Sequence, residues 1–223
     1  MLDLTSIELI IFDCDGVLVD SEGLAAEVFA KHLSGLGWTM TAQECSRRFT
    51  GLSLSSCDQL IETKLGKALP HDFFAAMQKE TFTRFDRDLL AVEGVEDLLK
   101  SLTLLYCIAS SGDYEKLAKT LTKTNLKQYF GDNIYSAVEV EKGKPEPDLL
   151  LYAAHKMGAI AAANCLVIED SLPGIAAAKA AGMQSVQYTP SGQPVSPIAT
   201  EHVTSMAQLQ RRLMTVTRVA SDE

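Results

Sequence analysis

Residues 9–20 read LIIFDCDGVLVD, an apolar run that ends in two carboxylates and a glycine. A short, fully apolar run near the start of a chain predicts a buried parallel strand. Asp13 and Asp15 point to the same side, because side chains repeat with a period of two in an extended backbone. Gly16 then lets the chain turn away. Open α/β sheets bind ligands at this end of their strands, although Asp and Gly are also common in ordinary turns.

Length and composition restrict the class of protein. The chain has 223 residues, 47% of them hydrophobic and 22% charged, which is typical of a folded protein with a large core. A net charge of -9 and a pI near 5.0 argue against a surface for nucleic acid or anionic membranes. No apolar run approaches the length of a membrane span, and the N-terminus lacks the features of a signal peptide. The five cysteines include no CxxC pair, which indicates a reducing cytoplasm.

The periodicity of apolar residues changes twice along the chain. Between residues 21 and 88 it is helical, with helices expected after Ser21 and over residues 42–49, 52–65 and 71–88. From residue 89 strands and helices alternate. Strands are expected at 102–110, 135–140, 165–168 and 185–188, and helices at 113–124, 147–157 and 172–181, before an amphipathic stretch around 206–213. This alternation predicts an α/β fold, a Rossmann-like parallel sheet with helices on both faces.

Polar or charged residues follow each of the first four expected strands. The second ends in Ser110, Ser111 and a glycine before a helix, which is a ready anion site. The third leads to Lys144, which follows a glycine and precedes Pro145 and Pro147, and the fourth ends in Glu169 and Asp170. Taken singly, these residues are ordinary helix caps and surface charges. Because parallel strands end at one edge of the sheet, together they predict an active site.

The same residues resemble all four motifs of the haloacid dehalogenase (HAD) superfamily, in order. The stretches are DCDGVLVDSE from Asp13, LYCIASSG with Ser110, GKPEPD with Lys144, and VIEDSLPGIAAAKAAG with Asp170. The chain resembles the subgroup with a helical cap inserted after the first motif, which includes β-phosphoglucomutase and 6-phosphogluconate phosphatase. The resemblance implies a HAD-like core domain formed by residues 1–20 and 89–223 and a helical cap domain formed by residues 21–88.

The resemblance also implies an activity. It indicates a Mg²⁺-dependent phosphatase that acts on a small phosphorylated metabolite, a sugar phosphate such as 6-phosphogluconate, through an aspartyl-phosphate. Such an enzyme is expected in the cytoplasm as a monomer or weak homodimer, with no nucleic-acid or membrane partner. By this resemblance Asp13 is the nucleophile and Asp15 the general acid and base. The implied phosphate ligands are Ser110, Ser111 and Lys144. The implied Mg²⁺ ligands are Asp13, the backbone carbonyl of Asp15, Asp170 and Glu169.

Two alternatives remain open from the sequence, beside a catalytically silent binding module, which the intact set of motifs does not support. A phosphosugar mutase of the β-phosphoglucomutase type is the nearer one. The resemblance places Ala25 where that mutase carries a His, and Leu54, after Gly51, where it carries an Arg for the second phosphate. Arg47 and Arg48 are candidate contacts for an anionic substrate. A signalling receiver domain is the more distant alternative, and it fits less well because the candidate acceptor Asp13 lies on the first strand and a helical insertion follows it.

Overall fold

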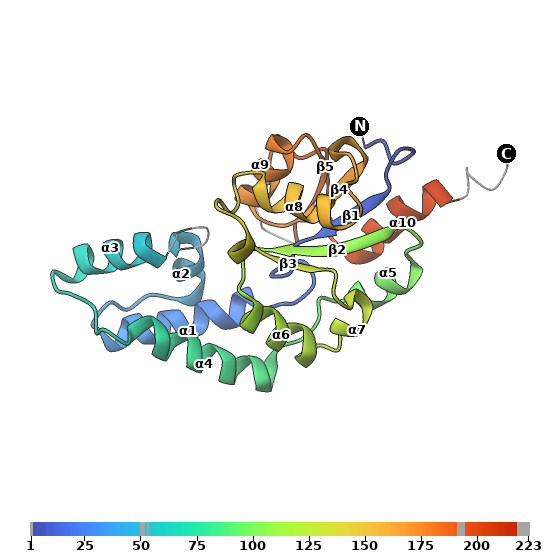
Figure 1. Cartoon of the computed structure of the whole chain (residues 1–223). Coiled ribbons are helices and arrows are strands. Elements are labelled where there is room, and N and C mark those ends of the chain that lie inside the picture. Colours follow the sequence, from blue (N-terminus) through green and yellow to red (C-terminus); the bar gives the residue numbers. More distant parts are fainter. Residues whose placement is uncertain (1, 50–51, 53, 191–194, 218–223) are drawn as a thin grey trace. The chain divides into compact units, whose positions relative to one another are not determined.

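The computed structural model describes residues 2–49, 52, 54–190 and 195–217. By their internal contacts these residues form two compact units, one of Met1–Val19 with Ala91–Glu223 and one of Asp20–Leu90. Figure 1 shows the mixed α/β elements of the first unit and the helices of the second. The chain passes twice between the units, at residues 19–20 and 90–91.

Parallel strands make up the sheet of the first unit. In the described part of the chain the order is β3-β2-β1-β4-β5-β6, and every neighbouring pair is parallel. The strands are β1 (Leu9–Phe12), β2 (Leu105–Ser110), β3 (Ile134–Ser136), β4 (Cys165–Glu169), β5 (Gln184–Tyr188) and β6 (Glu201–Val203). All four residues of β1 are buried, because β2 and β4 flank the strand and helices cover the sheet.

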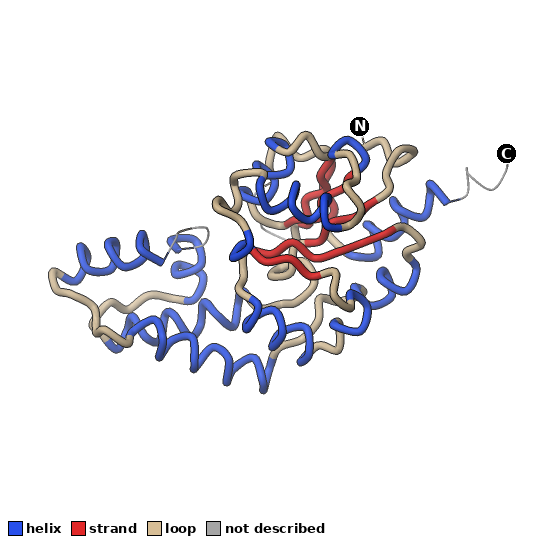
Figure 2. Tube along the Cα trace, in the orientation of Figure 1, coloured by secondary structure: helices blue, strands red, loops and turns tan. Residues whose placement is uncertain are grey.

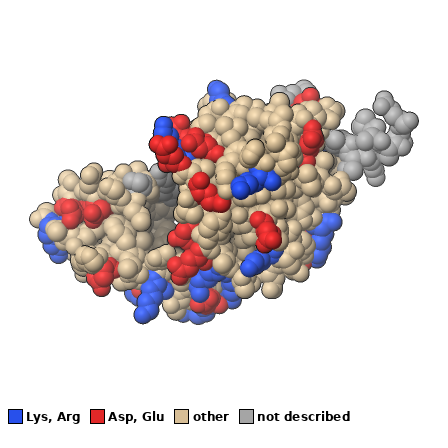
Figure 3. All heavy atoms as spheres, in the orientation of Figure 1, with Lys and Arg blue, Asp and Glu red and all other residues tan. Residues whose placement is uncertain are grey.

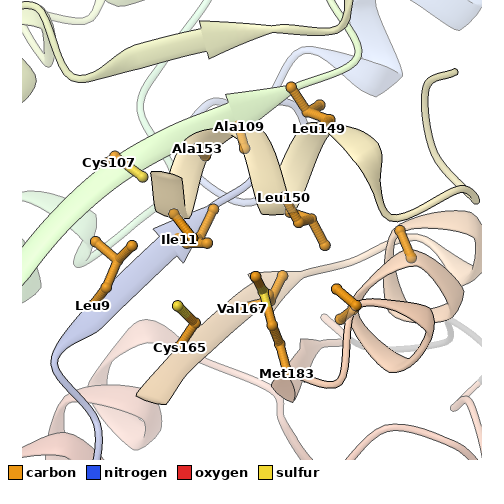
Figure 4. Packing of buried hydrophobic residues seen from close by; sticks show 14 residues of the cluster. Leu9, Ile11, Cys107, Ala109, Leu149, Leu150, Ala153, Cys165, Val167 and Met183 are labelled. Atoms are coloured by element: carbon orange, nitrogen blue, oxygen red, sulfur yellow. The ribbon is translucent and has the colours of Figure 1, made fainter. Parts of the chain in front are cut away.

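Helices lie on both faces of this sheet, as Figure 2 shows. On one face α8 (Asp148–Lys156) and α9 (Leu172–Ala180) enclose a cluster that includes Ile11 and Val167 (Figure 4). On the other face Phe130 of α7 (Lys127–Phe130) packs edge-to-face on Phe12, with ring centroids 6.3 Å apart. The other α-helices in the described part of this unit are α5 (Val95–Ser101), α6 (Tyr114–Lys123) and α10 (Met206–Thr217). The predicted Rossmann-like sheet with helices on both faces is confirmed.

The regular secondary structure of the second unit, within its described residues, consists of helices. Its helices are α1 (Glu22–Gly35), α2 (Ala42–Phe49), α3 (Leu54–Leu65) and α4 (Phe73–Asp88). They have a hydrophobic core of their own, in which Leu33 and Ile61 are fully buried and Phe29 stacks near Phe49, with ring centroids 4.6 Å apart. The described residues between 20 and 90 therefore hold together through their own packing rather than as a long loop.

The third strand differs from its prediction. A strand was expected over residues 135–140, but β3 ends at Ser136 and a 3-10 helix follows over Ala137–Glu139. The Ser136 hydroxyl accepts a hydrogen bond from Val138 N, and the Glu139 carboxylate accepts one from Ser136 N. This reciprocal pair is a capping box, which starts a helical turn and ends the strand. The sheet also continues past the last expected strand, since β6 pairs with β5.

Two further features of the fold are the distribution of charged residues on its surface and the state of its cysteines. On the face displayed in Figure 3, Lys and Arg are interspersed with Asp and Glu. All five cysteines are free and buried. Among the described helices, none combines the length and the apolar character that crossing a membrane requires.

One glycine of α9 is in close contact with a buried carboxylate at the end of β4. A Cβ atom added to Gly174 would lie 1.9 Å from Glu169 Oε2 and 2.0 Å from its Cδ atom, far inside van der Waals contact. The Glu169 side chain is 1% exposed and bound to other groups, so it has no open space into which to move. The position therefore has to be a glycine if Glu169 is to stay where it is.

We expect Gly174→Ala to destabilise the protein by about 1–3 kcal/mol, because overpacking against Glu169 outweighs the gain in helix propensity. Urea denaturation with its midpoint and slope measures the change in the free energy of unfolding. Gly23→Ala in α1 is the matched control, since a Cβ atom there has nothing within 4 Å. It should be neutral or stabilise by up to about 1 kcal/mol. A Gly174→Ala protein as stable as the control variant would contradict this packing.

Candidate active site

Asp13 and Glu169 are neighbours because the strands that precede them are paired. Phe12 lies opposite Ile168 in the register of β1 and β4, and Asp13 N donates to the Ile168 carbonyl at 2.9 Å. The next residues along the two strands, Asp13 and Glu169, therefore leave the sheet side by side. Both are buried, with 8% and 1% of their surface exposed.

Lys144 bridges these two carboxylates. Its Nζ atom donates to Asp13 Oδ1 at 2.6 Å and to Glu169 Oε2 at 2.7 Å, and its side chain is 4% exposed. Lys144 lies in the loop between β3 and α8, far in sequence from both Asp13 and Glu169. A buried ammonium group between two buried carboxylates is a charged cluster that would be costly if any member were missing.

Burial and charge act on this cluster in opposite directions. Burial, and then the neighbouring charge of Glu169, raise the pKa of Asp13 to about 7 although Lys144 opposes them. Burial also acts to raise the pKa of Glu169, but Lys144 and the hydrogen bonds from Ser171 outweigh it and hold that pKa below its ordinary value. Burial acts to lower the pKa of Lys144, but the two carboxylates raise it above its ordinary value, so the ammonium form is secured.

Three carboxylates form a candidate metal site. Asp13, Glu169 and Asp170 each offer an oxygen atom, and these oxygens lie within 4.8 Å of one another. Carboxylate oxygens are the donors that Mg²⁺ prefers, so the residues present fit a hard divalent cation. Gly16 gives Asp170 its room, since a Cβ atom there would lie 2.1 Å from Asp170 Oδ2 and the residue has a φ of +76°.

Asp15 has a different partner. The Lys116 Nζ atom donates to Asp15 Oδ2 at 2.7 Å, and the two side chains are 31% and 23% exposed. Burial acts to lower the pKa of Lys116, but the Asp15 carboxylate raises it above its ordinary value. Sequence reasoning did not identify Lys116. The available signal was its position three residues after Asp113, the N-cap of the helix that follows the Ser110-Ser111-Gly112 stretch.

The end of β2 contributes a buried hydroxyl. Ser110 is 1% exposed, and its Oγ atom accepts a hydrogen bond from Gly112 N at 3.1 Å. A Cβ atom on Gly112 would lie 3.4 Å from Ser110 Oγ and 3.8 Å from Asp15 Oδ2, so both oxygens lie close to this glycine. Ser111 is exposed. The structure thus brings Asp13, Lys144, Glu169 and Asp170 together, joins Asp15 to Lys116, and leaves Ser111 on the surface.

The residues singled out in the helical unit have ordinary surroundings. Leu54 is 65% exposed at the start of α3. The guanidinium carbon of Arg48 lies 5.3 Å from the centroid of the Trp38 ring, a cation–π distance. Arg47 is exposed, and Gly51 lies outside the described residues.

Comparison with known proteins gives the family. Residues 7–182 match the haloacid dehalogenase-like hydrolase family. The chain is 30% identical over 209 residues to 6-phosphogluconate phosphatase of Escherichia coli K12, covering 93% of this chain and 94% of that one. A conserved haloacid dehalogenase-like protein of unknown function from Agrobacterium tumefaciens has a TM-score of 0.83 at 32% identity, over 95% and 99% of the two chains. A HAD family hydrolase from Deinococcus radiodurans R1, crystallised with phosphate and sodium, has a TM-score of 0.81 at 29% identity, over 96% and 97%. The chain therefore belongs to the haloacid dehalogenase-like hydrolases.

Proposed function

We propose that this protein is a Mg²⁺-dependent phosphatase of small phosphorylated metabolites, in particular of a sugar phosphate such as 6-phosphogluconate. The observation that carries the proposal is the buried Lys144 beside Asp13, within a cluster of carboxylates at the ends of adjacent parallel strands. A cation beside a nucleophile can bind a phosphoryl group and stabilise the charge that spreads over its oxygens. The similarity to the E. coli 6-phosphogluconate phosphatase supports the choice of substrate.

The proposed reaction begins with attack by Asp13. A carboxylate oxygen of Asp13 forms a bond to phosphorus in line with the leaving oxygen, and the bond from phosphorus to the leaving oxygen breaks. Asp15, in its protonated form, gives its proton to that oxygen, so that the product is a neutral alcohol. Lys144 and Ser110 bind the phosphoryl oxygens during this transfer, and the exposed Ser111 contributes at the edge of the phosphate site.

The second step returns the enzyme to its starting state. Asp15, now a carboxylate, takes a proton from a water molecule, and the oxygen of that water attacks phosphorus. The bond between Asp13 and phosphorus breaks, which releases inorganic phosphate and restores the Asp13 carboxylate. Asp13, Asp170, Glu169 and the backbone carbonyl of Asp15 would hold Mg²⁺. When bound there, the cation offsets the repulsion between these carboxylates and the phosphate dianion.

We prefer hydrolysis to phosphoryl transfer between two positions of a sugar. A mutase has to retain a bisphosphate intermediate and therefore needs a cation for the second phosphate. Leu54 cannot supply this charge, and Arg48 already lies over the Trp38 ring. We assign the selection among substrates to the helical cap domain of residues 21–88, attached to a core of residues 1–20 and 89–223.

The proposed setting of the enzyme follows from its thiols and its substrate. Five buried, free cysteines suit a reducing compartment, and we propose that the enzyme acts in the cytoplasm. We further propose that it works as a monomer or weak homodimer with a small-molecule partner, since each sugar phosphate requires only one such active site.

The nucleophile is tested by Asp13→Asn. We expect the wild-type protein with Mg²⁺ to release phosphate from 6-phosphogluconate or another sugar phosphate, and the variant to lose roughly a thousandfold or more of kcat, because an amide cannot form the covalent intermediate. A phosphate-release assay over a panel of sugar phosphates, nucleotides and phosphoglycolate measures both. Asp132→Asn, at an exposed position, is the control. Substantial activity in a folded Asp13→Asn protein would exclude Asp13 as the nucleophile.

The metal assignment is tested by Asp170→Ala. Removal of one of the carboxylate ligands should raise the Mg²⁺ concentration for half-maximal activity about tenfold or more. Titration of Mg²⁺ at saturating substrate measures this shift, and Asp132→Ala should leave it unchanged. An identical Mg²⁺ titration in the wild-type protein and the Asp170→Ala variant would show that the cation binds elsewhere.

A further inference from the structure

Lys116 occupies a position that its own helix does not favour. It is the third residue of α6, whose N-cap is Asp113. The positive end of the helix dipole lies here, so acidic residues are favoured in the first turn and a cation is opposed. Asp113 and Glu115 follow that rule and Lys116 departs from it. The position of Lys116 is therefore not explained by the stability of α6.

The surroundings of Lys116 direct it to Asp15. The Asp113 side chain accepts a hydrogen bond from Lys116 N at 2.8 Å, which fixes the first turn of α6. The Lys116 side chain then passes Gly112, where an added Cβ atom would lie 3.4 Å from Lys116 Cδ. Its Nζ atom ends 2.7 Å from Asp15 Oδ2. The Gly112 carbonyl in turn accepts a hydrogen bond from the Ser136 hydroxyl at 2.6 Å, which fixes the loop beneath the lysine.

The two lysines near the site bind different carboxylates. Lys144 binds Asp13 and Glu169, and Lys116 binds Asp15, 101 residues away in sequence. Asp15, the acid and base of the proposed reaction, thus has a cation of its own, Lys116, which is supplied by α6. At 31% and 23% exposed, this pair is shielded enough from water for the contact to be held.

We propose that Lys116 is a positioning residue of the reaction, one that binds the Asp15 carboxyl group and holds it where it exchanges a proton with the leaving oxygen and then with water. The inference rests on the proposed phosphatase function, in which Asp15 is the acid and base. An ammonium group can donate to a carboxylate and, more weakly, to the carbonyl oxygen of a carboxylic acid. The contact can therefore persist through both steps while the proton moves to the leaving oxygen and a second proton arrives from water.

The dependence of the rate on the leaving group tests this role. An alkoxide needs a proton from Asp15 in order to leave, whereas a nitrophenolate does not. The value of kcat/KM includes only the steps up to departure of the leaving group. We therefore expect Lys116→Met to lower kcat/KM for glycerol 2-phosphate roughly tenfold or more beyond its effect on p-nitrophenyl phosphate. Lys116→Arg should restore most of the loss, because a guanidinium group can also donate to Asp15.

Two controls make the comparison specific. Lys123→Met removes a lysine at the other end of α6 and should leave both values unchanged. Lys116→Met combined with Asp15→Asn should be no slower than Asp15→Asn alone, because a residue that acts through Asp15 has no effect once Asp15 is replaced. Lys116→Gln provides the same comparison if Lys116→Met does not melt cooperatively.

The outcomes separate this inference from the function on which it rests. If the wild-type protein hydrolyses both esters and the variants lose both activities equally, or lose neither, Lys116 does not act through Asp15 although the phosphatase proposal stands. If the wild-type protein releases phosphate from neither ester and from no member of the sugar phosphate panel, the proposed function fails and this inference fails with it. A loss confined to the alkyl ester, restored by Lys116→Arg, supports it.

Discussion

The contact on which the rest of the site depends is that of the buried Lys144 ammonium group with Asp13 and Glu169. Two carboxylates so close together and so far from water would repel one another, and one of them would take up a proton. A cation between them offsets part of this repulsion: it holds the pKa of Glu169 below its ordinary value, while the pKa of Asp13 is still raised to about 7. The same cluster sets requirements elsewhere in the fold, because Gly174 must lack a side chain if Glu169 is to reach Lys144.

The parallel sheet makes this contact possible. Strands β1, β2 and β4 are adjacent, so residues that are about 100 and 155 positions apart in sequence meet at one edge, from Asp13 to Ser110 and to Glu169. Helix α6 follows β2 directly and brings Lys116 to Asp15. Asp13, Glu169 and Lys116 are thus placed by a strand or helix that holds or adjoins them, whereas Lys144 comes from the loop between β3 and α8.

The sequence contained enough information to predict the sheet and most of the charged cluster. Apolar runs such as LIIF over residues 9–12 have the length and character of a buried parallel strand, and the carboxylates follow where such strands end. β6 was missed because its three residues, Glu-His-Val, carry no detectable pattern. The predicted third strand extends beyond β3 because the capping box of Ser136 and Glu139 overrides the strand propensity of residues 138–140. Lys116 was missed because a lysine in a helix is ordinarily a surface residue, and only its contact with Asp15 in the folded chain distinguishes it.

The most direct test of the account is to identify the residue that carries the phosphoryl group during turnover. Wild-type enzyme is mixed with a sugar phosphate and Mg²⁺, quenched within one turnover and treated with borohydride, which reduces an aspartyl-phosphate to homoserine. Peptide mass mapping then locates the reduced residue. The account predicts reduction at position 13, in the peptide that contains the DCDG stretch. Phosphate release with no reduced residue, or with reduction at any other position, would contradict it.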